Sequence, residues 1–249
     1  MNRGNVHTII RKGEGRNFMW KTFLIFVSLC FLIFNYNTAL GAGHEKDIII
    51  EQKEVTKVEL ELIFVAGKLT LSGGAKNLME GKFLYQEKEP KIVYDPLGDH
   101  GYLYMEQRNE ASVKKRSVWN VLLHRHIPLA MHIATGGSEA KLDFRDITIE
   151  KLLLENGVGD TVIYLNGNYQ TGFESWIHGG VGNIKIILPK DIGVIVKTKN
   201  DRGTIKAKDF IEKEKNIYVN EQYGKAGVLI DVEVTMGIGE VELVLANNH

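Results

Sequence analysis

Gly180-Val181-Gly182-Asn183-Ile184-Lys185-Ile186-Ile187-Leu188 is a glycine-rich phrase followed directly by a run of mostly apolar residues. Two further clear copies of the phrase begin at Gly157 and Gly237, and looser copies surround Gly137 and Gly203. With the second glycine of each phrase as the marker, positions 137, 159, 182 and 203 lie 22, 23 and 21 residues apart. A period of about 20–50 residues is typical of stacked repeats, because a single unit cannot bury its apolar face alone.

Each unit of about 22 residues contains two short apolar runs, and two strands of five or six residues plus two turns fill that length. The sequence therefore predicts an all-β fold in which residues 129–249 form a β-solenoid or β-roll. Residues 44–128 are predicted to form a β-rich region before it, since runs such as Val58–Leu62 alternate apolar and polar residues with period two. One apolar helix is expected within residues 1–43.

We expect the repeated glycines to hold the corners of the rungs. A corner requires a positive φ angle or a close approach between rungs, and both conditions exclude a side chain. The period breaks between Gly203 and Gly239, which are 36 residues apart, and the charged segment 209–216 in this interval predicts a projecting loop. The predicted corner residues are Gly137, Gly157, Gly159, Gly180, Gly182, Gly203, Gly237 and Gly239.

The first 43 residues differ in composition from the rest of the chain. Five basic residues and one acidic residue accompany an apolar run over residues 22–34, the pattern of a secretory signal peptide. Small residues near Ala39 could provide its cleavage site, whereas an uncleaved chain would be anchored in a membrane by residues 22–36. In either case positive charge stays on the cytoplasmic side, so we expect the remainder to be extracytoplasmic, either secreted or membrane-anchored.

The charges of the remaining 206 residues are 26 basic (31 − 5) and 30 acidic (31 − 1), a net charge of −4. A nucleic-acid-binding surface needs clustered Lys and Arg, so this balance argues against a nucleic-acid partner. The chain's single cysteine, Cys30, lies in the apolar run. Disulfides and thiolate chemistry are therefore excluded from the predicted β region.

Two groups of residues invite a metal-binding interpretation. Asp160, Asn183 and Glu240 follow the glycine phrases, but calcium-binding rolls need an aspartate two residues after the last glycine and a nine-residue period. His124, His126 and His132 form a histidine cluster without an acidic or cysteine partner at ligand spacing. The sequence therefore predicts turn residues and solvated or half-buried histidines, with no metal, cofactor or catalytic group.

Two sets of side chains are candidates for ligand contact. Lys114, Lys115 and Arg116 could contact an anionic lipid or a wall polymer, although a solvated loop is the alternative. Trp176, Tyr164 and Tyr169 could offer an aromatic platform for a glycan, or could pack within the repeats.

A series of phrases links residues 58–247 to a known family. These phrases are Val65–Ala75, Leu78–Phe83, Ile127–Leu129, Leu142–Phe144, the Gly-x-Gly-acid copies, Leu188–Val194 and Ile217–Gly224. Together they resemble the toast-rack β-proteins of bacterial envelopes, which are related to the LiaF-type cell-wall-active-antibiotic response proteins. The resemblance implies envelope association and, for some relatives, a regulatory role in stress signalling. It implies no catalytic residues, and LiaF-type proteins usually have several membrane helices where this chain has one apolar segment.

These observations favour a non-enzymatic, exported, envelope-associated protein that acts as a binding or regulatory module. Its partner would be an envelope protein or a component of the cell wall or membrane. One alternative is a carbohydrate-active enzyme on a β-helix scaffold, with acids and bases converging in a groove. Another is a structural or adhesive surface protein, which would self-associate through an open end of the stack.

Overall fold

The computed structural model describes residues 43–107 and 117–247, and every regular element in them is a β-strand. This confirms the predicted all-β class. The predicted N-terminal apolar helix lies outside the described residues. Among the residues that are described, no helix is long and apolar enough to span a membrane. The strands are β1 (His44–Ile50), β2 (Lys57–Ala75), β3 (Met79–Tyr85), β4 (Lys91–Leu97), β5 (His100–Glu106), β6 (Ser117–His124), β7 (Leu129–Asp143), β8 (Ile149–Val158), β9 (Thr161–Tyr164), β10 (Phe173–Pro189), β11 (Gly193–Lys206), β12 (Ile211–Glu214), β13 (Ile217–Val219) and β14 (Leu229–Ala246).

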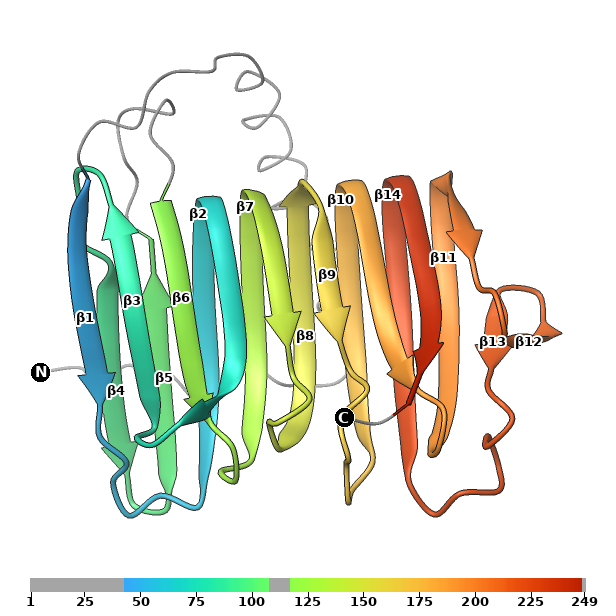
Figure 1. Cartoon of the computed structure of the whole chain (residues 1–249), viewed down its shortest axis with the longest axis horizontal. Coiled ribbons are helices and arrows are strands. Elements are labelled where there is room, and N and C mark those ends of the chain that lie inside the picture. The colour runs from blue at the N-terminus through green and yellow to red at the C-terminus, as the bar shows by residue number, and fades with distance from the viewer. Residues whose placement is uncertain (1–42, 108–116, 248–249) are drawn as a thin grey trace, which may run out of the picture.

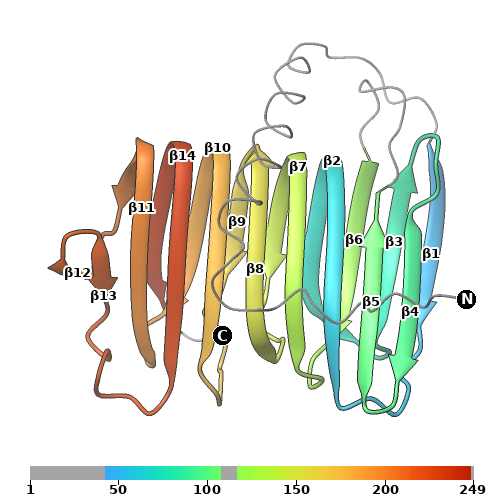
Figure 2. The same cartoon turned by 180° about the vertical axis from the view of Figure 1, so that it is seen from behind.

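The long strands bend in their middle, so that each contributes to two layers (Figures 1 and 2). In β2, Lys57–Ile63 pair with β5, whereas Gly67–Ala75 pair with β6. Likewise β10 pairs with β8 before its bend and with β9 after it. We call the layer that contains β4, β5, β8 and the first halves of the long strands the first layer. The second layer contains β1, β3, β6, β9 and the second halves.

The apolar core lies between the two layers. Burial alternates along the strands, with Leu60 and Leu62 of β2 pointing inward, as the period-two pattern of this segment predicts. Trp119 is fully buried between Phe64 and Phe83, at ring-centroid distances of 5.2 and 5.0 Å. The core extends without interruption from Val55 to Leu243.

No break in the sheet marks the predicted division between residues 44–128 and 129–249. β2 and β7 pair in parallel across this boundary, from Val58 beside Leu129 to Ser72 beside Asp143. The residues on both sides of position 128 therefore share one sheet and one core.

The order of the strands differs from the chain order at the C-terminal end. β7, β8 and β10 lie side by side in chain order, but β14 lies between β10 and β11, where the repeat predicts β11 beside β10. A physical reason is visible at the bends: β14 has both glycines of the phrase and can pack closely on those of β10. β11 has only Gly203 of the phrase and lies at the outside.

Candidate functional site

The second glycines of the three clear phrases lie at the bends between the layers. Gly159, Gly182 and Gly239 have φ angles of 127°, 137° and 137°. A Cβ atom added at Gly182 would lie 2.1 Å from the carbonyl oxygen of Gly159, and one at Gly239 would lie 1.7 Å from that of Gly182. These bends therefore exclude other residues for two separate reasons, backbone conformation and contact with the neighbouring strand.

The first glycines of the same phrases are constrained only by contact with the neighbouring strand. A Cβ atom on Gly157, Gly180 or Gly237 would lie 3.0, 2.3 or 2.6 Å from a carbonyl oxygen of the adjacent strand. Their φ angles are outside the left-handed range. Close packing of neighbouring bends, rather than backbone conformation, excludes a side chain at Gly180 and Gly237, whereas at Gly157 a side chain would require the neighbouring strand to shift slightly.

The looser copies of the phrase are placed differently. Gly137 lies beside Val158, one residue out of step with Gly159, and an added Cβ atom would contact nothing within 4 Å. Gly203 lies beside Gly239 in the outer strand β11. Gly67, which is not among the predicted corner residues, has a φ of 128° and lies beside Ser138 at the bend of β2. Its signal in the sequence is a single glycine before the alternating run Lys68–Ser72.

The polar residues after the glycine phrases bond to residues of the neighbouring strands. Asp160 Oδ1 accepts hydrogen bonds of 3.0 Å from the backbone N–H and from Nδ2 of Asn183. Glu240 forms an ion pair of 2.7 Å with Lys206. Within residues 43–107 and 117–247, no group of three or more His, Cys, Asp or Glu side chains is arranged to hold a metal ion.

Of the three histidines in the predicted cluster, His124 and His126 contact each other and His132 lies apart. His124 is the last residue of β6 and His126 lies in the turn that follows. His124 Nδ1 accepts hydrogen bonds from the backbone N–H groups of His126 and Ile127 at 3.2 and 3.3 Å. Burial lowers the pKa of His124 below its ordinary 6.5, and the nearby His126 adds to this effect. His132 instead lies on β7 and contacts Glu155.

The predicted aromatic platform is not assembled from its three members. Tyr169 is buried and donates a hydrogen bond of 3.0 Å to the carbonyl oxygen of Phe144. Tyr164 lies on β9 in the second layer, under the side chains of Lys141 and Arg145. Trp176 lies on β10 in the first layer, with Lys151 Nζ 4.6 Å from its ring centroid. Lys114, Lys115 and Arg116 lie outside the described residues.

Trp176 belongs instead to a row of outward side chains that crosses the first layer. Successive members lie at one level of the sheet on β5, β2, β7, β8, β10 and β14. At a strand spacing of about 4.8 Å, five steps span about 24 Å. Lys91 Nζ lies 4.9 Å from the ring centroid of Tyr104 at one end of the row. We call the set Tyr104, Glu61, His132, Leu153, Trp176 and Glu233 the 104–233 row.

Two polar contacts lie next to each other on this layer, and His132 of the row makes one of them. His132 Nε2 is 2.9 Å from Glu155 Oε2, and His178 Nδ1 is 2.7 Å from Thr235 Oγ1. Glu155 and His178 are cross-strand neighbours, which brings the two contacts together. The hydrogen bond from His132 holds the pKa of Glu155 below its ordinary 4.5, although burial opposes the shift. Burial lowers the pKa of His178 below 6.5, against the attraction of Glu155 and Glu233.

These shifts predict that acidification destabilises the folded chain. Because the pKa of His178 is lower in the folded chain, its stabilising contribution is present above the ordinary pKa of 6.5 and is lost as the pH falls from there through the folded pKa. Glu155 has the same sign at lower pH: its contribution is present above pH 4.5 and is lost as the pH falls through its folded pKa. We expect the thermal midpoint to fall between pH 7 and pH 5, and His178→Gln to reduce this fall. The matched control is His44→Gln, at an exposed position of β1, and an equal pH dependence of both variants would contradict the assignment.

The arrangement is suited to binding rather than to enclosing a small substrate. The 104–233 row offers two aromatic rings, an imidazole, two carboxylates and an aliphatic side chain on one open sheet surface. Two shallow hollows of about 390 and 210 Å³ occur elsewhere in the described residues. The first lies between β1 and β4, and the second lies along the second layer beside Asp160 and Glu242.

Comparison with known proteins identifies the family of this all-β chain. Residues 40–187 match the family described as the N-terminal domain of toast_rack, DUF2154. The chain therefore belongs to the toast-rack family. No curated protein matches the chain.

Two solved structures are similar to the chain. The crystal structure of "a putative cell adhesion protein" from Clostridium sporogenes is 34% identical, with a TM-score of 0.76, and the match covers 82% of this chain and 100% of that one. The crystal structure of "a putative adhesin" from Bacteroides fragilis is 12% identical, with a TM-score of 0.32, over 81% of this chain and 96% of that one. A likeness as low as the second supports no conclusion about this chain.

Proposed function

We propose that this chain is an exported, envelope-associated protein that binds a surface component without catalysing a reaction. The observation that carries this proposal is the likeness of the chain, over 82% of its length, to the Clostridium sporogenes protein called "a putative cell adhesion protein". Membership of the toast-rack family agrees with it. Residues 22–36 would either anchor the chain or be removed with the leader.

The binding surface in this proposal is the 104–233 row. Tyr104 and Trp176 lie four strands apart, about 19 Å at the usual strand spacing, which matches an extended polymer better than a small molecule. Lys151 and Lys91 lie over the two rings, so a ligand would meet both cationic and aromatic groups. A glycan of the cell wall or an extended segment of an envelope protein has this chemistry.

Co-sedimentation with isolated bacterial envelopes tests the proposal. We expect saturable binding of the full chain, and we expect Trp176→Ala to weaken it roughly tenfold, since a central aromatic contact contributes at least about 1 kcal/mol. Tyr164→Ala, on the opposite layer, is the matched control and should bind as the parent chain does. If Tyr164→Ala lowered binding and Trp176→Ala did not, the surface would be wrong. If the parent chain failed to sediment with envelopes, the function would be wrong.

The proposal extends to location and to a regulatory role in envelope stress. Protease treatment of intact cells should digest the chain, and N-terminal sequencing of the membrane-bound product should show whether residues 22–36 are retained. In a regulatory role, deletion of the chain should change the transcriptional response to cell-wall antibiotics, and restoring the chain as Trp176→Ala should not reverse the change. A normal response with the Trp176→Ala chain would show that regulation does not use the 104–233 row.

A further inference from the structure

Both ends of the stack present sheet edges without a partner among the described residues. At one end β1 pairs only with β3. At the other end β11 pairs with β14 along its length, while β13 covers only Ile195–Lys197 on its outer side. No strand among the described residues therefore pairs with the outer edge of Arg202–Lys206, in the second layer. An open edge offers backbone N–H and C=O groups to another strand.

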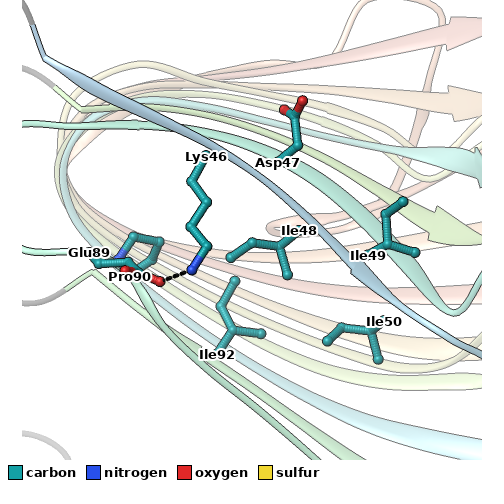
Figure 3. Close-up of a pocket in the computed structure, with 8 residues that line it drawn as sticks. All are labelled: Lys46, Asp47, Ile48, Ile49, Ile50, Glu89, Pro90 and Ile92. Carbon is teal, nitrogen blue, oxygen red and sulfur yellow. Dashed lines mark hydrogen bonds and ion pairs between the residues drawn. The ribbon is translucent and has the colours of Figure 1, made fainter.

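The β1 end also exposes apolar surface. The hollow of about 390 Å³ described above is a groove between β1 and β4, the edge strands of the two layers (Figure 3). Ile48, Ile50 and Ile92 line it, and an ion pair between Lys46 and Glu89 crosses it at one side. β4 contains Pro96, which lacks an N–H group, whereas β1 has no proline. The β1 edge is therefore the better of the two for adding a strand.

The β11 end has matching apolar residues. Ile205, Ala207 and Phe210 are partly buried hydrophobic residues packed against the end of the core. A strand added beside Arg202–Lys206 would cover Ile205 on its inward side. The two ends of the molecule thus present inward-facing apolar residues next to open edges in the same layer.

The strand directions at the two ends are compatible with continuation of the sheet. β1 is antiparallel to β3, β3 is antiparallel to β6, and β6 is parallel to β2. β2, β7, β9, β10, β14 and β11 are all mutually parallel in the second layer. β1 of one copy would therefore run parallel to β11 of another, which is the pairing that already joins β11 to β14.

The charges at the two edges are complementary. Residues that lie side by side on successive strands form a level that crosses the second layer from Asp47 of β1 to Lys206 of β11. The charges of its last three members, Lys185, Glu242 and Lys206, alternate in sign. Asp47 of a second copy would come next and Lys82 of that copy would follow, which continues the alternation. The whole level is Asp47, Lys82, Asn120, Thr70, Lys141, Val162, Lys185, Glu242 and Lys206.

Pairing of identical edges is disfavoured by the same charges. Two β1 strands paired antiparallel about Asp47 would place its carboxylate opposite that of the second copy, and two β11 edges would bring Arg202 and Lys206 together. Like charges that face each other across strands are destabilising. The edges therefore favour a head-to-tail contact over a two-fold symmetric one.

We propose that this chain assembles head-to-tail, with β1 of one copy adding to the open edge of β11 of the next. Such a contact uses different surfaces on the two copies and does not close on itself, so it produces linear assemblies. The proposal does not depend on the proposed binding function, because it involves neither the 104–233 row nor a ligand.

A charge exchange tests the contact. Sedimentation velocity of the full chain over a range of concentrations should show assemblies longer than a dimer. Asp47→Lys should weaken association at least tenfold, Lys206→Asp should do the same, and the double variant should recover assembly because the opposite charges are restored. Thermal midpoints check that each variant is folded. A parent chain that stays monomeric, or a double variant weaker than both single variants, would overturn the proposal.

A disulfide test does not depend on these charges. Neighbouring strands bring Cα atoms within the range of about 4.4–6.8 Å that a disulfide requires. In a Cys30→Ser background, the variant Asp47→Cys with Lys206→Cys should give a ladder of oxidised multimers in non-reducing electrophoresis. Each single cysteine variant should remain monomeric. Dimers from Asp47→Cys alone would show that β1 pairs with β1, and monomers from the double variant would show that the edges do not meet.

Discussion

Gly182→Val is expected to lower the free energy of unfolding by about 3–5 kcal/mol, since backbone strain of about 1–3 kcal/mol adds to a comparable overpacking term. The strain arises from a φ of 137°, which a β-branched residue avoids. The overpacking arises because Cβ would lie 2.1 Å from the carbonyl oxygen of Gly159 in the adjacent strand. Chemical denaturation measures the difference.

Alanine variants separate the two contributions. Gly224 has a φ of 74° and open space around it, so Gly224→Ala tests backbone strain alone. Gly180→Ala tests steric overlap alone, because its Cβ atom would lie 2.3 Å from the carbonyl oxygen of Gly157. Gly137→Ala has neither problem. We expect Gly137→Ala to be near neutral, Gly224→Ala and Gly180→Ala to be intermediate, and Gly182→Ala to be the most destabilising. A Gly182→Ala chain as stable as Gly137→Ala would show that the bends do not need glycine.

Trp119→Ala is expected to destabilise the fold by about 3–5 kcal/mol through loss of buried apolar area and formation of a cavity. Trp119 is fully buried and packs against Phe64 and Phe83 at ring-centroid distances of 5.2 and 5.0 Å. The substitution removes contacts that join β2, β3 and β6.

Trp119→Phe provides the matched comparison. The indole Nε1 is buried without a hydrogen-bond partner among the described residues, so its removal relieves a penalty of about 1–3 kcal/mol while part of the ring volume is lost. We expect the net change to stay within about 1 kcal/mol. If Trp119→Phe were as damaging as Trp119→Ala, the Nε1 atom would have a partner in the folded chain.

The glycine phrases and the apolar alternation were sufficient to predict the all-β class, because both are local features of the sequence. The position of β14 was not predictable from them, since spacing along the chain does not specify which strand lies next to which. The prediction for Gly137 was one residue off for a related reason. In its strand Ser138, and not Gly137, lies beside Gly159, the second glycine of the next copy. Register, rather than composition, decides such cases.

Only part of the 104–233 row has a signal in the sequence. His132, Leu153 and Trp176 lie 21 (153 − 132) and 23 (176 − 153) residues apart, whereas Tyr104, Glu61 and Glu233 are not one repeat away from them. The contact between His132 and Glu155 also left a signal. His132, Glu155 and His178 are separated by 23 residues each (155 − 132 and 178 − 155), which is close to the repeat length. Polar residues one repeat apart lie on neighbouring strands, so a search at this spacing would have paired His132 with an acidic partner.

We propose that the chain binds an envelope component and leaves it chemically unchanged. The most direct measurement is to incubate the purified full chain with isolated envelopes and to analyse both the bound protein and the released fragments by mass spectrometry. We predict that the chain is retained on the envelopes and that their polymers keep the same composition and length as in the untreated sample. Release of new glycan or peptide fragments in proportion to the added chain would contradict the account.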